Sequence, residues 1–525
     1  LDAEGQVYQV TLLEKLLVSL LAKLGNLVVD GGIWLNTQRP EWNDANNALV
    51  GQGLSLVTLC YMRRYVTFLR GLLTDRQSEL TLSAEVGRWL QETAHALRAL
   101  RPHLGDGPVD ERIRYQSLIA LGGAASRHRM TVYAQNGFSG VSPSPPALLE
   151  GLLDDALAAI DHSIRTNRRA DGLYHAYNLL GFRDESATVD TLHKMLEGQV
   201  AVLSSGAIPP SEAVELIEAL FRSDLFRPDQ ASFLLYPDRE LPGFLEKNRI
   251  PADAAAEIPL LATMLEAGDR RIVDRDEDGV LRFNADLSNA GDLDERLDRL
   301  VDAYGPALET AREPLHALYE AVFDHKSFTG RSGGMFGFEG LGSIYWHMVG
   351  KLLLAVQEVF FAACREGADE TVRDRLAGQY YRIRAGLGFN KTPAEYGAFP
   401  IDPYSHTPRH AGAQQPGMTG QVKEEILTRY GELGLRIFGG AAHFEPALLR
   451  AREFLTRPVT FRFLDVDDEW REIVVPEGGL AFTFCQVPIV YRLADDGATG
   501  VTVQLDDGGR ESLPGQTLPE RLSQD

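Results

Sequence analysis

The stretch that decides the predicted fold is residues 11–29, TLLEKLLVSLLAKLGNLVV. Leucines recur in it at the three- and four-residue spacing that places apolar side chains on one face of a helix. Glu14, Lys15 and Lys23 interrupt the apolar run, whereas a membrane-spanning helix needs about 20 predominantly apolar residues in a row. The segment therefore predicts an amphipathic helix with one buried stripe. The stripe consists of Leu12, Leu13, Leu16, Leu17, Leu20, Leu21 and Leu24.

The same helical periodicity returns along most of the chain, and short loops rich in Gly, Pro, Asn and Asp separate the segments. No fixed-period repeat indicates a solenoid. Paired helices joined by long polar loops favour a mainly α fold, an (α/α)6 helical toroid over residues 1–455. Further helices are predicted over residues 48–75, 80–102, 146–166, 186–203, 211–222, 254–267, 292–323, 343–366, 369–385 and 418–436.

Alternation typical of strands is rare before residue 458 and frequent after it. It predicts a small C-terminal β-sheet module with a short tail, over residues 456–525. The module is expected to pack against the helical domain, and glycan binding is the alternative role. The predicted strands are Val459–Phe463, Glu472–Val475, Leu480–Phe484, Val487–Tyr491 and Val501–Leu505.

The composition limits the classes of partner. The chain has 525 residues, and its 52 basic and 74 acidic side chains give a formal net charge of −22. A surface this negative repels phosphate backbones and anionic lipids, so neither nucleic acid nor membrane is expected as a partner. A neutral carbohydrate substrate is compatible with this charge.

The three cysteines, Cys60, Cys364 and Cys485, are widely spaced and include no CxxC pair. This spacing argues against a disulfide framework and against a thiolate zinc site. It suits a reducing compartment. The sequence predicts no metal and no cofactor.

The first of three chemically rich loops is residues 39–47, RPEWNDANN. Carboxylates and amides bind sugar hydroxyls, and aromatic faces stack on sugar rings. A carboxyl group beside an indole can be desolvated, which raises its pKa and suits it to act as a general acid. The alternative is a helix cap formed by Asn43 or Asp44. Because a cap needs only one such residue, the loop favours a carbohydrate site made of Glu41, Trp42, Asn43, Asp44, Asn46 and Asn47.

The second loop, residues 328–343, is glycine-rich, which lets backbone amides approach a ligand closely. Arg331 is a candidate anion ligand, and Trp346 and His347 lie at the start of the next helix. A nucleotide P-loop is excluded because no Gly-Lys-Ser/Thr follows. A flexible loop with an aromatic anchor in the core is the alternative.

The third loop covers residues 390–420, and long ordered loops in compact domains are usually functional. His406 and His410 lie four residues apart, but Pro408 argues against a helix, so a zinc pair is not expected. In the helix that follows, Glu424 and Glu425 either complement the helix N-terminus or supply a general base. The candidate binding residues of the loop are Tyr396, His406, His410, Gln414 and Gln415.

One further motif, Asp274–Gly279, matches the first half of a calcium-binding loop. Position 12 of that frame is Ala285, where a bidentate Glu is required. The motif therefore predicts an Asp-Gly turn between two short strands, Ile272-Val273 and Val280–Phe283.

Three islands, in order along the chain, resemble the cellobiose and chitobiose phosphorylase family and related (α/α)6-barrel glycoside hydrolases. Glu41-Trp42-Asn43-Asp44 resembles the family's Asp-Trp-Asn-Asp motif. Gly342-Ser343-Ile344-Tyr345-Trp346 is similar to its Gly-Ser-Ala-x-Trp segment. The late run is similar to the family's Leu-Thr-Gly, Leu-Gly-Ile-Arg and Ile-Asp-Pro. This run consists of Met418-Thr419-Gly420, Leu433-Gly434-Leu435-Arg436 and Phe444-Glu445-Pro446.

The resemblance implies that Asp44 is the general acid that protonates the glycosidic oxygen. The sequence departs from the family at Glu41, the first motif position, and at Gln421, where the family has a phosphate-binding Thr. If water replaces phosphate, a carboxylate base is needed opposite Asp44, and Glu425, or else Glu424, is the candidate. The main prediction is an inverting glycoside hydrolase of oligo- or polysaccharides, with its two carboxyl groups about 6.5–9.5 Å apart.

In this interpretation Trp42, Trp346 and Tyr396 stack on sugar rings. The amides that bind hydroxyls are those of Asn43, Asn46, Asn47, Gln414 and Gln415. Two alternatives stay open. An inverting phosphorylase predicts a basic pocket made of Arg331 with His347 or His410. An inactive glycan-binding protein predicts that the loops converge but that Asp44 only caps a helix or forms a salt bridge.

In the family the acid motif lies mid-barrel, whereas only 40 residues precede Glu41 here. An N-terminal portion is therefore expected to be absent from this chain or supplied separately. No signal peptide is visible, but this says little about export when the native start is expected to be absent. The cysteine usage favours a cytoplasmic location, and a periplasmic one stays open. A homodimer also stays open.

Overall fold

The computed structural model describes residues 6–36, 49–73, 80–237, 243–323, 344, 346–387, 419–493, 499–505 and 508–523. The chain divides into two compact units. The first contains Leu1–Tyr345 and Thr392–Pro416, and the second contains Trp346–Lys391 and Gly417–Asp525. Each unit is described by itself.

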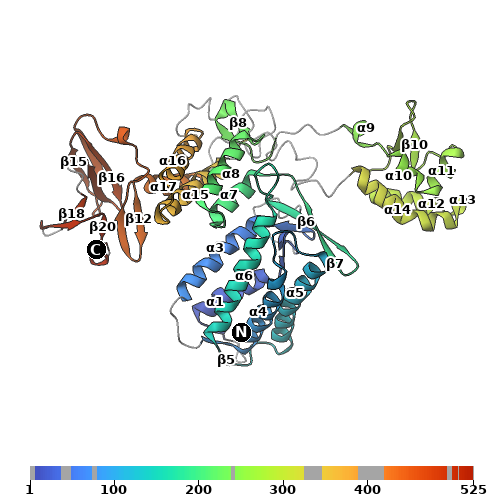
Figure 1. Ribbon diagram of the computed structural model, residues 1–525, viewed down its shortest axis with the longest axis horizontal. Helices are drawn as coiled ribbons and strands as arrows, with labels where there is room; N and C mark the ends of the chain where they lie inside the picture. The colour runs from blue at the N-terminus through green and yellow to red at the C-terminus, as the bar shows by residue number, and fades with distance from the viewer. Residues whose placement is uncertain are drawn as a thin grey trace. The chain divides into compact units, whose positions relative to one another are not determined.

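The first unit is built around a group of packed helices (Figure 1). In α1 the predicted stripe is buried at Leu17, Leu20, Leu21 and Leu24, whereas Leu12, in the first turn, is 73% exposed. The Thr11 side chain caps the helix by accepting a hydrogen bond from the Glu14 amide. α4 packs against α5 and α6, and α3 packs against α6 and α7. The helices are α1 (Leu12–Leu24), α3 (Leu56–Leu73), α4 (Ala84–Leu100), η1 (Arg101–His103), α5 (Glu111–Ala134), α6 (Pro146–Thr166), α7 (Leu196–Ser205), α8 (Pro210–Arg222) and η2 (Pro228–Gln230).

A five-stranded antiparallel sheet lies beside these helices, in the order β1-β2-β3-β6-β7. Ile33 pairs with Ser55, Leu54 with Asn178, and Phe182 with Ala187. Its strands are β1 (Leu27–Val28), β2 (Gly32–Trp34), β3 (Gly53–Ser55), β6 (Tyr177–Arg183) and β7 (Ser186–Thr191). Two short pairs complete this part: β4 (Leu80–Ser83) with β5 (Val141–Ser144), and β8 (Phe226–Arg227) with β9 (Ser232–Phe233).

The prediction of a mainly α fold, an (α/α)6 toroid, is therefore wrong. The structure is 52% helical and 21% strand, with several sheets. The sequence pattern missed the five-stranded sheet because β1, β2 and β3 have only two or three residues, too few to show alternation. The predicted helix over residues 186–203 begins as strand β7 and becomes helical only at Leu196.

Helix α5 is a second feature that the periodicity did not predict. Its 24 residues include the pair Gly122-Gly123, which disfavours a helix, and few of its side chains are buried. The glycines are explained by packing, because a Cβ at Gly122 would lie 3.5 Å from the Gly25 carbonyl, and one at Gly25 would lie 2.7 Å from the Ala125 Cβ. α1 and α5 thus approach each other closely where these small residues meet.

Residues 243–323 form a compact module with a hydrophobic core of its own. Leu261, Phe283, Leu297 and Leu315 are among its buried residues. At its two ends the rings of Phe244 and Phe323 stack with their centroids 6.4 Å apart. The module contains α9 (Phe244–Lys247), α10 (Ala252–Ala256), α11 (Pro259–Glu266), β10 (Val273–Arg275), β11 (Leu281–Phe283), α12 (Ala290–Arg299), α13 (Val301–Tyr304) and α14 (Pro306–Phe323).

The acidic motif of this module is the turn of the β10–β11 hairpin, as predicted. The Asp276 side chain accepts a hydrogen bond of 2.8 Å from the Val280 amide and pairs with Arg282. The Asp276 carboxylate therefore stabilises the turn of the hairpin.

The second unit combines three helices with paired strands. α15 packs against both α16 and α17. The predicted C-terminal strands are confirmed, but they form three separate hairpins, β14–β15, β16–β17 and β18–β19, and not one sheet. The elements are α15 (Trp346–Arg365), α16 (Glu370–Ala385), α17 (Thr419–Glu432), β12 (Leu435–Phe438), β13 (Ala441–Phe444), η6 (Ala451–Glu453), β14 (Val459–Leu464), β15 (Trp470–Val475), β16 (Gly479–Phe484), β17 (Val487–Arg492), β18 (Gly500–Gln504), β19 (Arg510–Pro514), β20 (Thr517–Leu518) and α18 (Glu520–Ser523).

Helix α15 is the core helix of this unit. Its segment His347–Arg365 is long and apolar enough to cross a membrane, with a mean hydropathy of 1.4, but 67% of the window examined is buried inside the protein. Because α15, α16 and α17 lie in the same unit as the hairpins, the unit extends to both sides of residue 455. The predicted domain boundary between 455 and 456 stays a prediction.

Candidate functional site

Most of the predicted site residues lie outside the described part of the chain. They are Glu41, Trp42, Asn43, Asp44, Asn46, Asn47, Arg331, Tyr396, His406, His410, Gln414 and Gln415. Trp346 begins α15. The side chains that the structure places are His347 on α15 and Glu424 and Glu425 on α17, and all three belong to the second unit. The roles predicted for these residues stay predictions.

Three basic side chains gather near the N-terminal parts of α15 and α17. His347 and Lys351 are one helical turn apart on α15, and Lys423 lies in the first part of α17. Both lysines act electrostatically on the His347 ring. The N-terminus of a helix carries a partial positive charge, so the helices add to the positive potential of the lysines. Within the described residues, neither lysine forms an ion pair with a carboxylate.

This environment sets the charge of His347. Burial, together with the charges of Lys351 and Lys423, lowers the pKa of His347 to about 4. At neutral pH the imidazole is therefore uncharged and can donate one N–H group. The cluster supplies two ammonium groups and one neutral imidazole, a set of donors that suits an anion.

Glu424 follows directly after Lys423 but points into the protein. It is 4% exposed, and its Oε2 has no hydrogen-bond partner within the described residues. A buried carboxylate oxygen without a donor is costly, because desolvation is not offset. Among the described residues, the Oε2 of Glu424 is therefore a buried hydrogen-bond acceptor without a donor.

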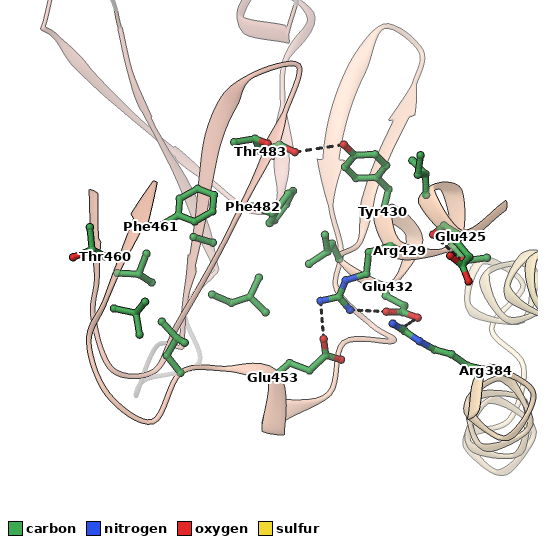
Figure 2. A pocket seen from close by; sticks show the side chains of 18 residues that line it. Arg384, Glu425, Arg429, Tyr430, Glu432, Glu453, Thr460, Phe461, Phe482 and Thr483 are labelled. Atoms are coloured by element: carbon green, nitrogen blue, oxygen red, sulfur yellow. Dashed lines mark hydrogen bonds and ion pairs between the residues drawn. The ribbon is translucent and has the colours of Figure 1, made fainter. Parts of the chain in front are cut away.

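Glu425 faces a different direction and lines a cavity of about 970 Å³ (Figure 2). One wall is α17, which contributes Arg429 and Tyr430. Strands β14, β15 and β16 form the opposite wall, where Phe461 and Phe482 are the largest side chains. The volume is in the range of small-molecule sites, about 300–1,000 Å³. Of the two predicted base candidates, Glu425 is the one beside this space.

An ion-pair network forms the polar side of the cavity. Figure 2 shows Arg429 between Glu432 and Glu453. The Arg429 guanidinium lies 2.6 Å from the Glu432 carboxylate and 2.7 Å from that of Glu453. Arg384, on α16, also pairs with Glu432, on α17. Glu432 is 1% exposed, and Tyr380 donates a hydrogen bond of 2.6 Å to its Oε1. Burial raises the pKa of Tyr380, so the phenol keeps the proton that it donates. Glu432 is thus fully compensated and stabilises this wall of the cavity.

Close packing of α15 and α17 supports the network. The Gln357 side chain donates to the Thr428 carbonyl at 2.7 Å, directly beside Gly431. A Cβ at Gly431 would lie 2.1 Å from the Gln357 Oε1. Only glycine therefore lets the amide of Gln357 reach the α17 backbone here.

Sequence reasoning named His347 for a basic pocket but missed Lys351 and Lys423, and it missed the Glu432 network. A signal existed for parts of each: His347 and Lys351 are four residues apart on a helix, and Arg429 and Glu432 are three apart. The pairs that cross from one helix to another carry no such signal, because they depend on tertiary packing. Within the described residues there is no group of three His, Cys, Asp or Glu side chains that could hold a metal ion.

The compact module of residues 243–323 decides which class of protein the chain resembles. Residues 241–326 match the GH149 phosphorylase insertion domain 2. The matched residues enclose the module, so sequence similarity and packing delimit the same segment. No curated protein matches the chain. The match supports a carbohydrate-active enzyme of a glycoside phosphorylase-like family, and it does not support a hydrolase specifically.

Proposed function

We propose that the chain is an inverting glycoside phosphorylase that acts on an oligo- or polysaccharide. The observation that carries the proposal is the match of residues 241–326 to an insertion domain described from phosphorylases. The main prediction from the sequence, hydrolysis, thereby yields to its alternative.

The charges of the second unit support a phosphate site at His347, Lys351 and Lys423. Inorganic phosphate is a small anion, and charge-assisted hydrogen bonds from ammonium groups hold such ions strongly. The N-termini of α15 and α17 favour the same ion. In a chain of net charge −22, two neighbouring lysines that form no ion pair with a carboxylate of the described residues give a local positive potential that favours phosphate.

In the proposed reaction, Asp44 donates its proton to the glycosidic oxygen as the bond from that oxygen to the anomeric carbon breaks. A phosphate oxygen attacks the anomeric carbon from the opposite face and forms the new bond. The products are a sugar 1-phosphate of inverted configuration and a glycan shortened by one unit. Lys351 and Lys423 would hold the phosphate, and the neutral His347 would donate one hydrogen bond to it.

This mechanism needs no carboxylate base, because phosphate is itself the nucleophile. Hydrolysis is kept as a second candidate on one observation, that Glu425 lines a cavity of about 970 Å³. In hydrolysis Glu425 would remove a proton from water on the face opposite Asp44. The two reactions differ in their products and in which residues they require.

Product analysis on a panel of α- and β-linked gluco-oligosaccharides, with and without inorganic phosphate, tests the proposal. We expect sugar 1-phosphate only when phosphate is present, and no product from Asp44→Asn. Free reducing sugar in the absence of phosphate, lost in Glu425→Gln, would replace phosphorolysis by hydrolysis. A chain that binds the oligosaccharides but converts none of them would support the glycan-binding alternative.

A further inference from the structure

The cavity beside α17 has no part in the proposed phosphorolysis, which needs no carboxylate base. It has a volume of about 970 Å³ and lies within the second unit, between α17 and the strands β14, β15 and β16 (Figure 2). Where a helix and strands pack directly, few voids larger than a water molecule remain. A space of this size between them is therefore a candidate ligand site of its own.

Two interactions cross from α17 to other elements that line the cavity, and Figure 2 shows both. Tyr430 donates a hydrogen bond of 3.4 Å to the Thr483 carbonyl on β16. The Arg429 guanidinium lies 2.7 Å from the carboxylate of Glu453 in η6. The cavity is thus held in shape by the protein itself, which lowers the cost of ordering it when a ligand binds.

The wall of the cavity is mainly apolar. The rings of Phe461 and Phe482 line it from the strand side, and so do the nearly fully buried side chains of Val475 and Leu480. A sugar carries hydroxyl groups around its whole edge, and these lose free energy against aliphatic side chains that cannot bond to them. The wall therefore favours a ligand with an aromatic or aliphatic body.

The charged side chains that line the cavity already have partners. Arg384 and Arg429 both pair with Glu432, and Arg429 also pairs with Glu453. Glu425, the other charged lining residue, has an interaction partner as well. An ionised ligand would have to displace one of these partners or be desolvated without compensation, which costs free energy. The cavity thus selects against charged ligands.

Uncharged polar groups are available along the edge of β16. Four consecutive residues of this strand, Leu480–Thr483, line the cavity, although their side chains point alternately to opposite faces. The cavity therefore runs along the edge of the strand. Among the described strands β16 pairs only with β17, and none of the lining residues belongs to β17. The edge beside the cavity thus presents backbone N–H and C=O groups, which can bind a hydroxyl, carbonyl or amide.

We propose that this cavity binds an uncharged organic molecule, not a sugar, that has an aromatic or aliphatic body and a hydrogen-bonding group. The proposal is independent of phosphorolysis, because that reaction uses none of the residues that line the cavity. It competes with hydrolysis by Glu425, which would place a sugar in the same space.

Nile red, an uncharged dye that fluoresces in apolar surroundings, tests the proposal on the full chain. We expect saturable binding of one dye per chain. Binding should be roughly tenfold weaker or more in Ala481→Trp and in Thr460→Trp, because each indole fills part of the cavity. The matched control is Ala441→Trp, which adds the same ring to β13, outside the cavity. Circular dichroism identifies the variants that keep the wild-type fold.

Several results of this titration would overturn the proposal. They are the absence of saturable binding in the wild type, an unchanged affinity in a folded cavity variant, and an equal loss in the Ala441→Trp control. None of these readouts depends on activity, so failure of the proposed reaction leaves the test intact.

Competition on the wild-type chain tests the chemical class of the ligand. Anilinonaphthalene sulfonate, an anionic dye, and thioflavin T, a cationic dye, should not displace Nile red. Displacement by either dye would refute the selection for uncharged ligands. The gluco-oligosaccharides of the activity panel should not displace it either. If they do, the cavity is a sugar site, the proposal is wrong, and hydrolysis by Glu425 gains support.

Discussion

Two buried or half-buried histidines, one in each unit, lie in opposite electrostatic environments. His162 is 1% exposed, and its ring nitrogens lie 2.8 Å from the Asp30 Oδ1 and 3.1 Å from the Gly105 carbonyl. Arg114 binds the other oxygen of Asp30 at 2.6 Å. His347, in contrast, lies beside Lys351 and Lys423, and its pKa is lowered to about 4.

The difference separates a structural cluster from a candidate ligand site. Around Asp30, backbone and side-chain donors satisfy the carboxylate, and its pKa is held below the ordinary value by hydrogen bonds from His162 and Arg114 that outweigh the effect of burial. Around His347 like charges are held together, which costs free energy unless an anion is bound. Compensated charge thus indicates a structural role in the fold, and concentrated charge of one sign indicates a ligand.

The largest expected effect comes from breaking the compensated cluster. Arg114→Met leaves Asp30 buried without its main cation, so we expect the free energy of unfolding to fall by about 3–5 kcal/mol. Urea denaturation measures it. The control is Arg127→Met, which removes a surface ion pair with Glu92 and should cost about 1 kcal/mol or less. An equal fall in the free energy of unfolding in the two variants would show that Arg114 does not compensate the buried Asp30 carboxylate.

A smaller effect on stability, but a clear one on function, is expected in the cationic cluster. Lys423→Met removes one charged donor, worth about 1.5–3 kcal/mol in a charge-assisted hydrogen bond, so the KM for phosphate should rise roughly tenfold or more. Initial rates at varied phosphate measure this. Lys15→Met, on the exposed side of α1, is the matched control and should leave this KM unchanged. The phosphate site is misplaced if both lysine variants behave like wild type.

The smallest effect is the pH dependence that His347 introduces. Its pKa lies at about 4 in the folded chain, below its ordinary value of 6.5, so between these values the unfolded chain binds a proton that the folded chain does not. The free energy of unfolding should therefore rise with pH through this window. Lys351→Met should bring the pKa of His347 closer to 6.5 and narrow the window. A histidine titration followed by NMR checks the shift, and a pKa that stays at its wild-type value would contradict the role of Lys351.

The parts of the fold that were predictable depend on contacts within one segment. The stripe of α1, the bounds of α6 and the C-terminal strands follow from periodicities that a short window contains. The five-stranded sheet does not, because β3 pairs with β6 more than a hundred residues later in the chain. Strands of two or three residues are stable only through such pairing, so their own sequence says little about them.

The candidate site also has a part that the sequence predicts and a part that depends on tertiary packing. The Met418-Thr419-Gly420 motif led to the prediction of a candidate base on α17, and one of the two candidates, Glu425, lines a cavity. The orientation of Glu424 into the protein could not be predicted, since adjacent helical residues point about 100° apart and only the packing of α15 decides which is buried. The grouping of His347, Lys351 and Lys423 likewise depends on how two helices meet.

The stacked rings of Phe244 and Phe323 have a consequence for how this protein could have been assembled in evolution. They bring the entry and exit of the 243–323 module to one point. A segment whose ends meet can be added to or removed from a host loop with little change in loop-closure entropy, about 0.6 kcal/mol for each doubling of loop length. The host then needs only to replace the module by a turn, so gain and loss of such a module would alter function without disturbing the rest of the fold.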